Sequence, residues 1–569
     1  MNKITTDICI VGTGFSGTFI ANILGGTSAR ILMLEKGAYL SWDSIGENYF
    51  RTLEKGGLSF ETREDYLKLL ESIYDDPEFL RYESTQSGVD AFTYSGKHAV
   101  GGTSLVWFGN ALRKVPNDFR TKSVYGFGFD WPISYDDLEK YYYQAEVAMG
   151  VSGPPEDFFS PYRKKPFPFP PFKLPPGAIE LNRILEGSGF EITPSHKARL
   201  PIDTTERPAC CGAGTCFIFC PTDAKYNCLT THLKDLRQRK EINILHKFAV
   251  SRLIQKDDRI VEAVAFDRNG NELRIGAEIF ILAANAVENA RILLLSQYHH
   301  LQTGFTSRSR TIGKYLTDQV GMWIPAFLPY NLYPSYQKTL QSTHSLSFYD
   351  GPFREEYSGV TVEIFLRLTP FASKLLTDNE QARSLIIDLI SKGYFGNELK
   401  KQIFLKSLGN FSLSLEMEML PEERNCVTLH PSQKNQFGDP IADFHFSIWD
   451  QEYLVRSKST YCNLFKKMFE NIGGFMGSPT QRNSYDHMLG TCRMGTNPLE
   501  SVVDENLKSH DHKNLYIIGG SAFPSAGCVN PTLTIVALAL RCGNYLVNHL
   551  KLDTKISQRH PPLPFDAVS

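Results

Sequence analysis

Four cysteines lie close together before the middle of the chain, at positions 210, 211, 216 and 220 in the stretch CCGAGTCFIFCP. Clustered thiols can bind zinc, form a disulfide or hold an iron–sulfur cluster. The gap between Cys216 and Cys220 suits half of a zinc site, but an adjacent pair such as Cys210–Cys211 rarely places both sulfurs on one ion. The order C-x3-C-P at 216–221 is similar to the end of a bacterial ferredoxin motif. A cysteine-rich loop without metal is the fourth interpretation, and the residues alone leave all four open.

A second set of reactive residues lies near the C-terminus, where His487 precedes LGTCRMG and Asn530 stands in GCVNPTLT. Oxidation of an alcohol to a carbonyl requires loss of the hydroxyl proton and departure of a hydride. Histidine, with an ordinary pKa of about 6.5, is well suited to accept that proton. An asparagine amide beside it can orient the hydroxyl group. The pair is therefore a candidate for alcohol oxidation, although a histidine in a loop, taken alone, is more often structural than catalytic.

The elements that would position this chemistry begin at the N-terminus. Residues 7–11 predict a buried strand, GTGFSG a glycine turn, the following apolar pattern a helix, and residues 30–37 a second strand. Gly12, Gly14 and Gly17 match G-x-G-x-x-G, and Glu35 lies at the distance expected for a carboxylate that binds a ribose hydroxyl. The arrangement predicts a dinucleotide site in which the helix N-terminus faces the phosphates.

Composition excludes several other classes of protein. The chain has 569 residues, with 60 basic and 62 acidic side chains and a formal net charge of −2. This balance argues against a nucleic-acid-binding protein. We find no apolar run long enough for a transmembrane helix, and the N-terminus leads directly into the strand pattern without a signal sequence. The expected location is therefore the cytoplasm.

Six stretches together resemble the glucose–methanol–choline (GMC) family of FAD-dependent oxidoreductases. These are the N-terminal glycine motif, VGGTSLVWFGNALR, FDWPISYDDLEKYY, ILAANAVENARILL and the C-terminal pair HMLGTCRMG and GCVNPTLTIVALALR. The resemblance implies an α/β fold in which a Rossmann-like FAD-binding domain is interleaved with a substrate-binding domain built on an antiparallel sheet. We expect the FAD domain to comprise 1–150, 240–320 and 480–552. Residues 151–239 would form a connecting segment that includes the cysteines, and 321–479 the substrate domain.

The resemblance also implies roles for individual residues. It makes His487 the catalytic base and Asn530 the second active-site residue. At the position where some family members bind the flavin covalently through a histidine, this chain has Val106, so we expect non-covalent FAD. The residues expected to bind it are Gly12, Gly14, Phe15, Ser16, Gly17, Glu35, Lys36, Gly101, Gly102, Ser104, Asn110, Ala111, Val250, Ala284, Gly520, Ser521, Asn530, Pro531 and Thr532.

Within the family, CCGAGTCFIFCPTDAKYN looks like the cluster segment of membrane-linked bacterial sugar dehydrogenases. That resemblance implies a three-iron–four-sulfur (3Fe-4S) cluster held by Cys210, Cys216 and Cys220, with Cys211 nearby. The implied enzyme is a dehydrogenase that oxidises a hydroxyl of a sugar, glycoside, polyol or cyclitol and passes its electrons on through the cluster. The alternative is a pyranose or glycoside oxidase that reduces dioxygen to hydrogen peroxide.

The same resemblance implies partners. A small subunit and a cytochrome or quinone electron acceptor are expected, while nucleic acid and a transmembrane segment are not. Related subunits leave the cytosol with a small partner that carries the signal sequence. Co-export to the periplasm is therefore the alternative to a cytoplasmic location.

Overall fold

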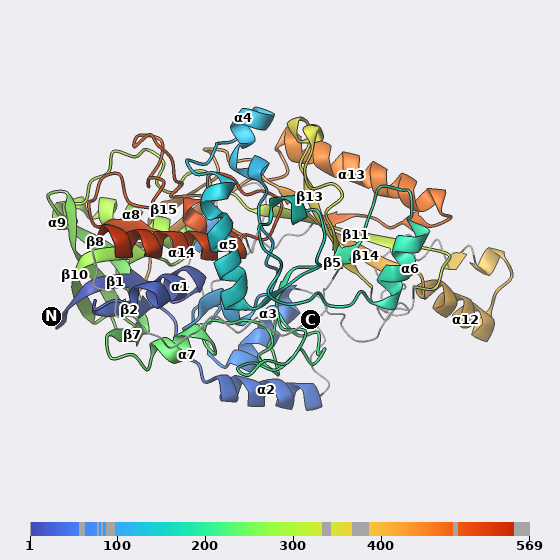
Figure 1. Cartoon of the computed structure of the whole chain (residues 1–569), viewed down its shortest axis with the longest axis horizontal. Coiled ribbons are helices and arrows are strands. Elements are labelled where there is room, and N and C mark those ends of the chain that lie inside the picture. The colour runs from blue at the N-terminus through green and yellow to red at the C-terminus, as the bar shows by residue number, and fades with distance from the viewer. Residues whose placement is uncertain are drawn as a thin grey trace.

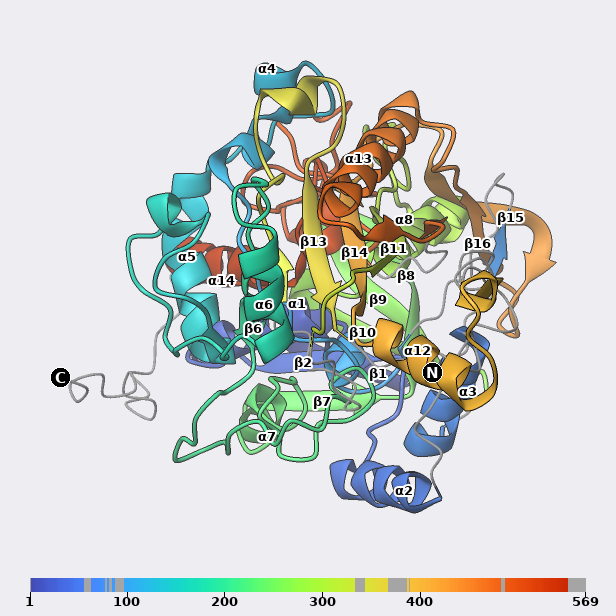
Figure 2. The ribbon, with the colours of Figure 1, turned by 90° about the vertical axis from the view of Figure 1, so that its right-hand side faces the viewer.

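The computed structural model describes residues 2–55, 63–76, 79–80, 84–86, 97–332, 343–366, 386–387, 389–481 and 487–550. Two seven-stranded sheets organise these residues, and helices pack around them (Figures 1 and 2). Each sheet has its own buried apolar cluster. Among the described residues, no helix is both long and apolar enough to cross a membrane.

The first sheet follows the strand order β7-β2-β1-β10-β9-β8, and β19 pairs with β10. Its central strands are parallel, because β1 pairs in parallel with both β2 and β10, whereas β9 is antiparallel to β10. Strands buried on both faces read as continuous apolar runs, as ILML at 31–34 of β2 does. The strands are β1 (Asn2–Val11), β2 (Ile31–Glu35), β7 (Ile242–His246), β8 (Phe248–Lys256), β9 (Arg259–Asp267), β10 (Glu272–Leu282) and β19 (Leu515–Ile517).

Helices from distant parts of the chain cover this sheet. Helix α1 (Phe15–Leu24) follows β1, and the C-terminal helix α14 (Thr532–His549) lies beside it (Figure 1). Helix α5 (Tyr135–Met149) packs on α14 in turn. Pro531 stands immediately before α14, where its fixed φ suits a helix start. The packing therefore places α1, near the N-terminus, beside α14, the last described helix.

The second sheet is antiparallel and follows the order β17-β11-β14-β13-β12-β5, with β18 also paired to β11. Helix α13 (Glu452–Asn471) packs on it, and its buried residues join the sheet's apolar cluster. The strands are β5 (Thr193–Pro194), β11 (Gln319–Phe327), β12 (Thr343–Ser345), β13 (Val360–Phe365), β14 (Asn410–Glu418), β17 (Phe475–Met476) and β18 (Thr480–Gln481).

The expected fold class, a Rossmann-like α/β unit beside an antiparallel sheet, is confirmed. The division into three regions stays a prediction. Strand β5, which lies within the proposed connecting segment 151–239, pairs with β12 as an edge strand of the second sheet. The structure describes further helices and strands outside these two sheets. They include α2 (Trp42–Glu54), α3 (Arg63–Tyr74), α12 (Gly396–Ser407) and the small sheet of β15 (Cys426–Lys434), β16 (Pro440–His445) and β3 (Ser84–Gln86).

Candidate active site

The glycine turn after β1 forms a cradle at the N-terminus of α1. Gly12 has a φ of +103°, and a Cβ there would lie 2.7 Å from the carbonyl oxygen of Ala283. A Cβ at Gly17 would lie 1.9 Å from the Gly12 carbonyl oxygen, so helix and turn pack together only because both residues lack side chains. Gly14, in contrast, has no atom within 4 Å of its would-be Cβ. The open space at Gly14 and the free N–H groups at the start of α1 fit the phosphates of a dinucleotide.

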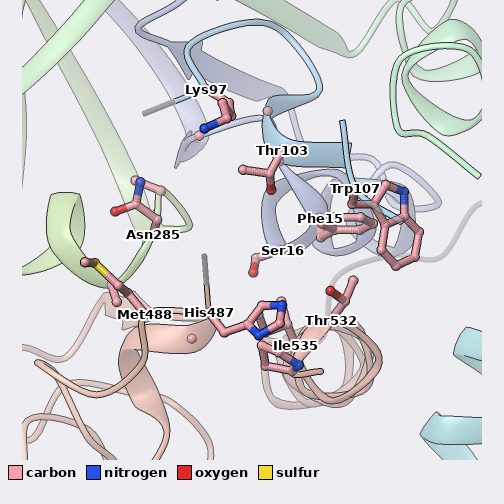
Figure 3. A pocket seen from close by; sticks show the side chains of 18 of the residues that line it. Phe15, Ser16, Lys97, Thr103, Trp107, Asn285, His487, Met488, Thr532 and Ile535 are labelled. Carbon is pink, nitrogen blue, oxygen red and sulfur yellow. The ribbon is translucent and has the colours of Figure 1, made fainter. Parts of the chain in front are cut away.

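The turn opens into a cavity of about 640 Å³ between the two sheets. This is within the range of about 300–1,000 Å³ typical of ligand-binding pockets. Figure 3 shows Phe15 and Trp107 on one side of it and His487, Thr532 and Ile535 on another. Of the residues predicted for the cofactor and for catalysis, the following line the cavity: Gly12, Gly14, Phe15, Ser16, Glu35, Lys36, Gly102, Asn110, Val250, Ala284, His487, Gly520, Asn530, Pro531 and Thr532.

Five predicted cofactor residues do not line the cavity but lie behind its wall: Gly17, Gly101, Ser104, Ala111 and Ser521. The N–H of Gly101 donates to Thr13 Oγ1 at 3.2 Å. Ser104 Oγ donates to the Gly101 carbonyl at 2.6 Å, and Ser521 Oγ accepts from Asn289 Nδ2 at 2.9 Å. These residues therefore support the wall through hydrogen bonds or close packing.

Glu35, the residue expected at the ribose, is bound to the glycine turn. Its Oε2 accepts the N–H and the hydroxyl of Thr13 at 3.1 and 2.7 Å, and its Oε1 accepts the N–H of Gly37 at 3.0 Å. Burial raises the pKa of this carboxyl above its usual value despite these hydrogen bonds. The side chain still lines the cavity, so it shapes the turn and remains next to the ligand space.

His487 and Asn530 come together across 43 positions of sequence. Asn530 Nδ2 lies 3.4 Å from His487 Nε2. An amide nitrogen can only donate, so the contact leaves the lone pair on Nε2, the form in which imidazole accepts a proton. The backbone N–H of His487 donates to Asp318 Oδ1 at 3.2 Å. The structure thus brings both predicted catalytic residues to one wall of the cavity.

The loop before Asn530 is fixed by buried polar side chains. Gln319 Nε2 donates to the carbonyl of Gly527 at 2.9 Å and also to that of Val529. Glu418 Oε1 accepts the N–H of Gly527 at 2.9 Å, and Lys114 Nζ donates to the carbonyl of Ala526. Burial lowers the pKa of Lys114, while the nearby carboxylates of Asp118 and Glu418 oppose the shift. Four backbone groups, on Ala526, Gly527 and Val529, are therefore anchored just before Asn530.

The second sheet contributes cavity residues that sequence analysis did not find: Trp323, Glu363, Phe365, Ser414 and Glu416. One signal for them exists in the strand FSLSLEMEM, where polar residues alternate with apolar ones. That alternation predicts one face toward a core and one toward something polar. It does not indicate that strands β11 and β13, each more than 40 residues away in the sequence, complete the same surface.

The cysteine segment lies in a described loop, and its four thiols are all free. Among the residues that the structure describes, no group of three or more His, Cys, Asp or Glu side chains is arranged to hold a metal ion. The expected 3Fe-4S site is therefore not shown. Cys216 and Cys220 are buried, Cys210 is half-buried and Cys211 is exposed.

Cationic side chains surround the buried thiol of Cys216. Burial by itself would raise the pKa of this thiol, but the charges of Arg199 and Lys225 outweigh it and the pKa lies below its ordinary value. Arg199 Nη1 is 3.4 Å from Cys216 Sγ. Arg199 Nε and Nη2 are buried without a hydrogen-bond partner in the described part of the chain. A buried guanidinium with two unmatched donors fits an anionic group larger than one thiolate.

Comparison with known proteins agrees with this geometry. Models of the GMC oxidoreductase family match residues 195–320 and 421–539. The fructose dehydrogenase large subunit of Gluconobacter japonicus is 28% identical over 96% of this chain and 99% of its own length. The 6'''-hydroxyparomomycin C oxidase of Streptomyces lividus is 25% identical over 96% and 92%. In structure, formate oxidase from Aspergillus oryzae superposes with a TM-score of 0.63 at 14% identity, covering 97% of this chain and 99% of that one.

The glycine cradle and the histidine–asparagine pair line one cavity, an arrangement that fits a flavin-dependent oxidoreductase. The chain belongs to the GMC oxidoreductase family. It is an FAD-dependent enzyme that oxidises alcohol groups, as expected from its sequence.

Proposed function

We propose that the chain is a dehydrogenase that oxidises a hydroxyl of a sugar, glycoside, polyol or cyclitol to a carbonyl or lactone. The observation that carries the proposal is the 3.4 Å contact between Asn530 Nδ2 and His487 Nε2 on the cavity wall. Similarity to a fructose dehydrogenase large subunit along nearly the whole chain supports a sugar-like substrate.

In this proposal the chain's own residues handle the proton. Asn530 orients the substrate hydroxyl, and His487 Nε2 accepts the proton from its oxygen. The Asp318 carboxylate holds the His487 backbone in place. When bound, FAD supplies the acceptor for the hydride that leaves the substrate carbon. The glycine cradle, Lys36 and the α14 N-terminus would hold FAD without a covalent bond, since Val106 lines the cavity where a histidine would be needed.

We also propose that Cys210, Cys216 and Cys220 hold a 3Fe-4S cluster, which supplies a one-electron path away from the flavin. Arg199 supports this because its unmatched buried donors suit an anionic, sulfide-rich group. Electrons would then leave for a cytochrome or quinone, in a complex with a small subunit. The proposed location is the cytoplasm, or the periplasm if such a partner exports the chain.

The oxidase alternative is supported by similarity to 6'''-hydroxyparomomycin C oxidase. Iron content and oxygen use separate the two. Anoxically purified protein should contain three irons per flavin and give a paramagnetic resonance signal that disappears when a reducing sugar substrate is added. Cys216→Ser should remove this signal, whereas Cys211→Ser, whose side chain is exposed, should keep it. Protein with full flavin and activity but no iron, producing stoichiometric peroxide, would establish the oxidase instead.

A further inference from the structure

The cavity-facing side of the second sheet presents a compact set of polar and aromatic side chains. Ser414 of β14 is directly opposite Trp323 on β11 and Glu363 on β13. Residues directly opposite on antiparallel strands share one face, so these three side chains form a row across the sheet. Glu416 and Phe365 lie two positions along β14 and β13, on the same face. All five residues line the cavity that also contains His487 and Asn530.

Glu363 is held in position by a chain of hydrogen bonds. Asn110 Nδ2 donates to Glu363 Oε1 at 2.5 Å, and Lys197 Nζ donates to Asn110 Oδ1. All three side chains are buried. A buried carboxylate is costly unless it is paired, and the nearby Lys197 charge provides that compensation. Because a carboxylate offers about four acceptor sites, Glu363 can accept further hydrogen bonds from a ligand.

Ser414 gives an independent indication of a ligand. Its side chain is 1% exposed, and its hydroxyl has no hydrogen-bond partner among the described residues. Buried polar groups are nearly always hydrogen-bonded in native proteins. Since Ser414 faces the cavity, a hydroxyl group of the substrate is a partner that its position allows.

Resting on the proposed function, we propose that Glu363 and Ser414 form a subsite for substrate hydroxyl groups other than the one being oxidised. The enzyme then selects neutral polyhydroxylated rings over simple alcohols. Hydroxyls donate to Glu363 and exchange a hydrogen bond with Ser414, while the aromatic pair Trp323–Phe365, with ring centroids 4.6 Å apart, covers apolar parts of the ring. Neutral substrates are favoured because Lys197 already offsets the charge of Glu363.

The test measures anaerobic flavin reduction in the FAD-loaded enzyme with D-glucose, D-fructose and myo-inositol, each compared with mono-deoxy analogues and with cyclohexanol. In the wild type, at least one deoxy analogue of the best substrate should have a half-saturating concentration about 10–100-fold higher than that of the parent sugar. This is the effect expected for a lost hydrogen bond to a charged group. Glu363→Gln should raise the half-saturating concentration to a similar extent for the parent sugar, with flavin content and the limiting rate of reduction preserved. In this variant, the deoxy analogue should have a half-saturating concentration little higher than that of the parent sugar.

Ser414→Ala is the second variant and Ser412→Ala its control. Ser412 lies two positions away on the same strand, but it does not line the cavity. We expect Ser414→Ala to raise the half-saturating concentration of the parent sugar about 3–10-fold, since a hydrogen bond between neutral groups is weaker. Ser412→Ala should leave it unchanged. Half-saturation within twofold of wild type in both Glu363→Gln and Ser414→Ala would overturn the subsite. So would a preference for D-glucosamine over D-glucose. A wild type whose flavin is reduced by none of the ring polyols would instead overturn the proposed function, and the subsite with it.

Discussion

Asp318 and Gln319 are neighbours in the chain, and each is hydrogen-bonded to the segment that carries one of the two candidate catalytic residues. Asp318 Oδ1 accepts the backbone N–H of His487, and Gln319 Nε2 donates to the carbonyls of Gly527 and Val529 just before Asn530. The segments that carry His487 and Asn530 are therefore both bonded to one point at the start of β11.

Replacing Gln319 should disturb turnover more than cofactor binding. Gln319→Leu leaves two backbone carbonyls without their donor, at a cost of about 1–3 kcal/mol for each buried group. We expect the limiting rate of flavin reduction to fall about 10–100-fold while flavin content is unchanged. Gln451→Leu is the matched control, because Gln451 is also buried and bonded to a backbone carbonyl, that of Leu420, but in the described part of the chain it is not hydrogen-bonded to the loop before Asn530. Equal rate losses in both variants would mean that Gln319 acts only on stability.

Removal of the proposed base should slow the reduction of the flavin by substrate without loss of bound flavin. His487→Ala should lower the rate of anaerobic flavin reduction about 10²–10⁴-fold, the usual range for general base catalysis. Its flavin content should stay normal, because the glycine cradle lies on another wall. Rapid-mixing absorbance of the flavin band is the measurement. A variant that retained the wild-type rate would exclude His487 as the base.

The glycines of the turn should respond differently to the same substitution. Gly14→Ala adds a methyl group where no protein atom lies within 4 Å, so the flavin-free protein should melt within about 2 °C of wild type. That methyl enters the space we assign to the FAD phosphates, and flavin affinity should fall at least about tenfold. Gly12→Ala, with a φ of +103° and a carbonyl at 2.7 Å, should destabilise the protein with or without flavin. If both variants bound flavin as tightly as the wild type, the position assigned to the phosphates would be wrong.

The stability of the protein should depend on His512 in weak acid. This ring stacks on Phe305 with centroids 4.8 Å apart, and burial lowers its pKa to about 4. The unfolded chain protonates near 6.5 and the folded one near 4, so the free energy of unfolding should fall as pH drops through this window. The largest contribution is about 3 kcal/mol, from 1.36 kcal/mol for each pKa unit. Denaturant unfolding from pH 7 to 4.5 should show a shallower decline in His512→Phe, and identical slopes would refute the assignment.

The parts of the site that sequence analysis predicted depend on short-range patterns. Gly12, Gly14 and Gly17 act within one turn, so their spacing alone indicates their roles. His487 and Asn530 were found from a family resemblance, which also spans local motifs. The substrate wall was not predictable in this way, because Trp323, Glu363 and Ser414 become neighbours only through the register of three strands. The Asp318–Gln319 connection was missed for the same reason, since its partners lie about 170 and 210 positions away.

One face of β14 carries Ser414 and Glu416 at the cavity and Glu418 at the loop before Asn530. A laboratory evolution campaign aimed at new substrates would find these two functions linked. Any backbone adjustment that accommodates a different side chain at position 416 also moves the carboxylate that holds Gly527. Substrate range and turnover should therefore change together when β14 is diversified. Libraries built on Phe365 of β13 offer a way to change the substrate range while sparing turnover.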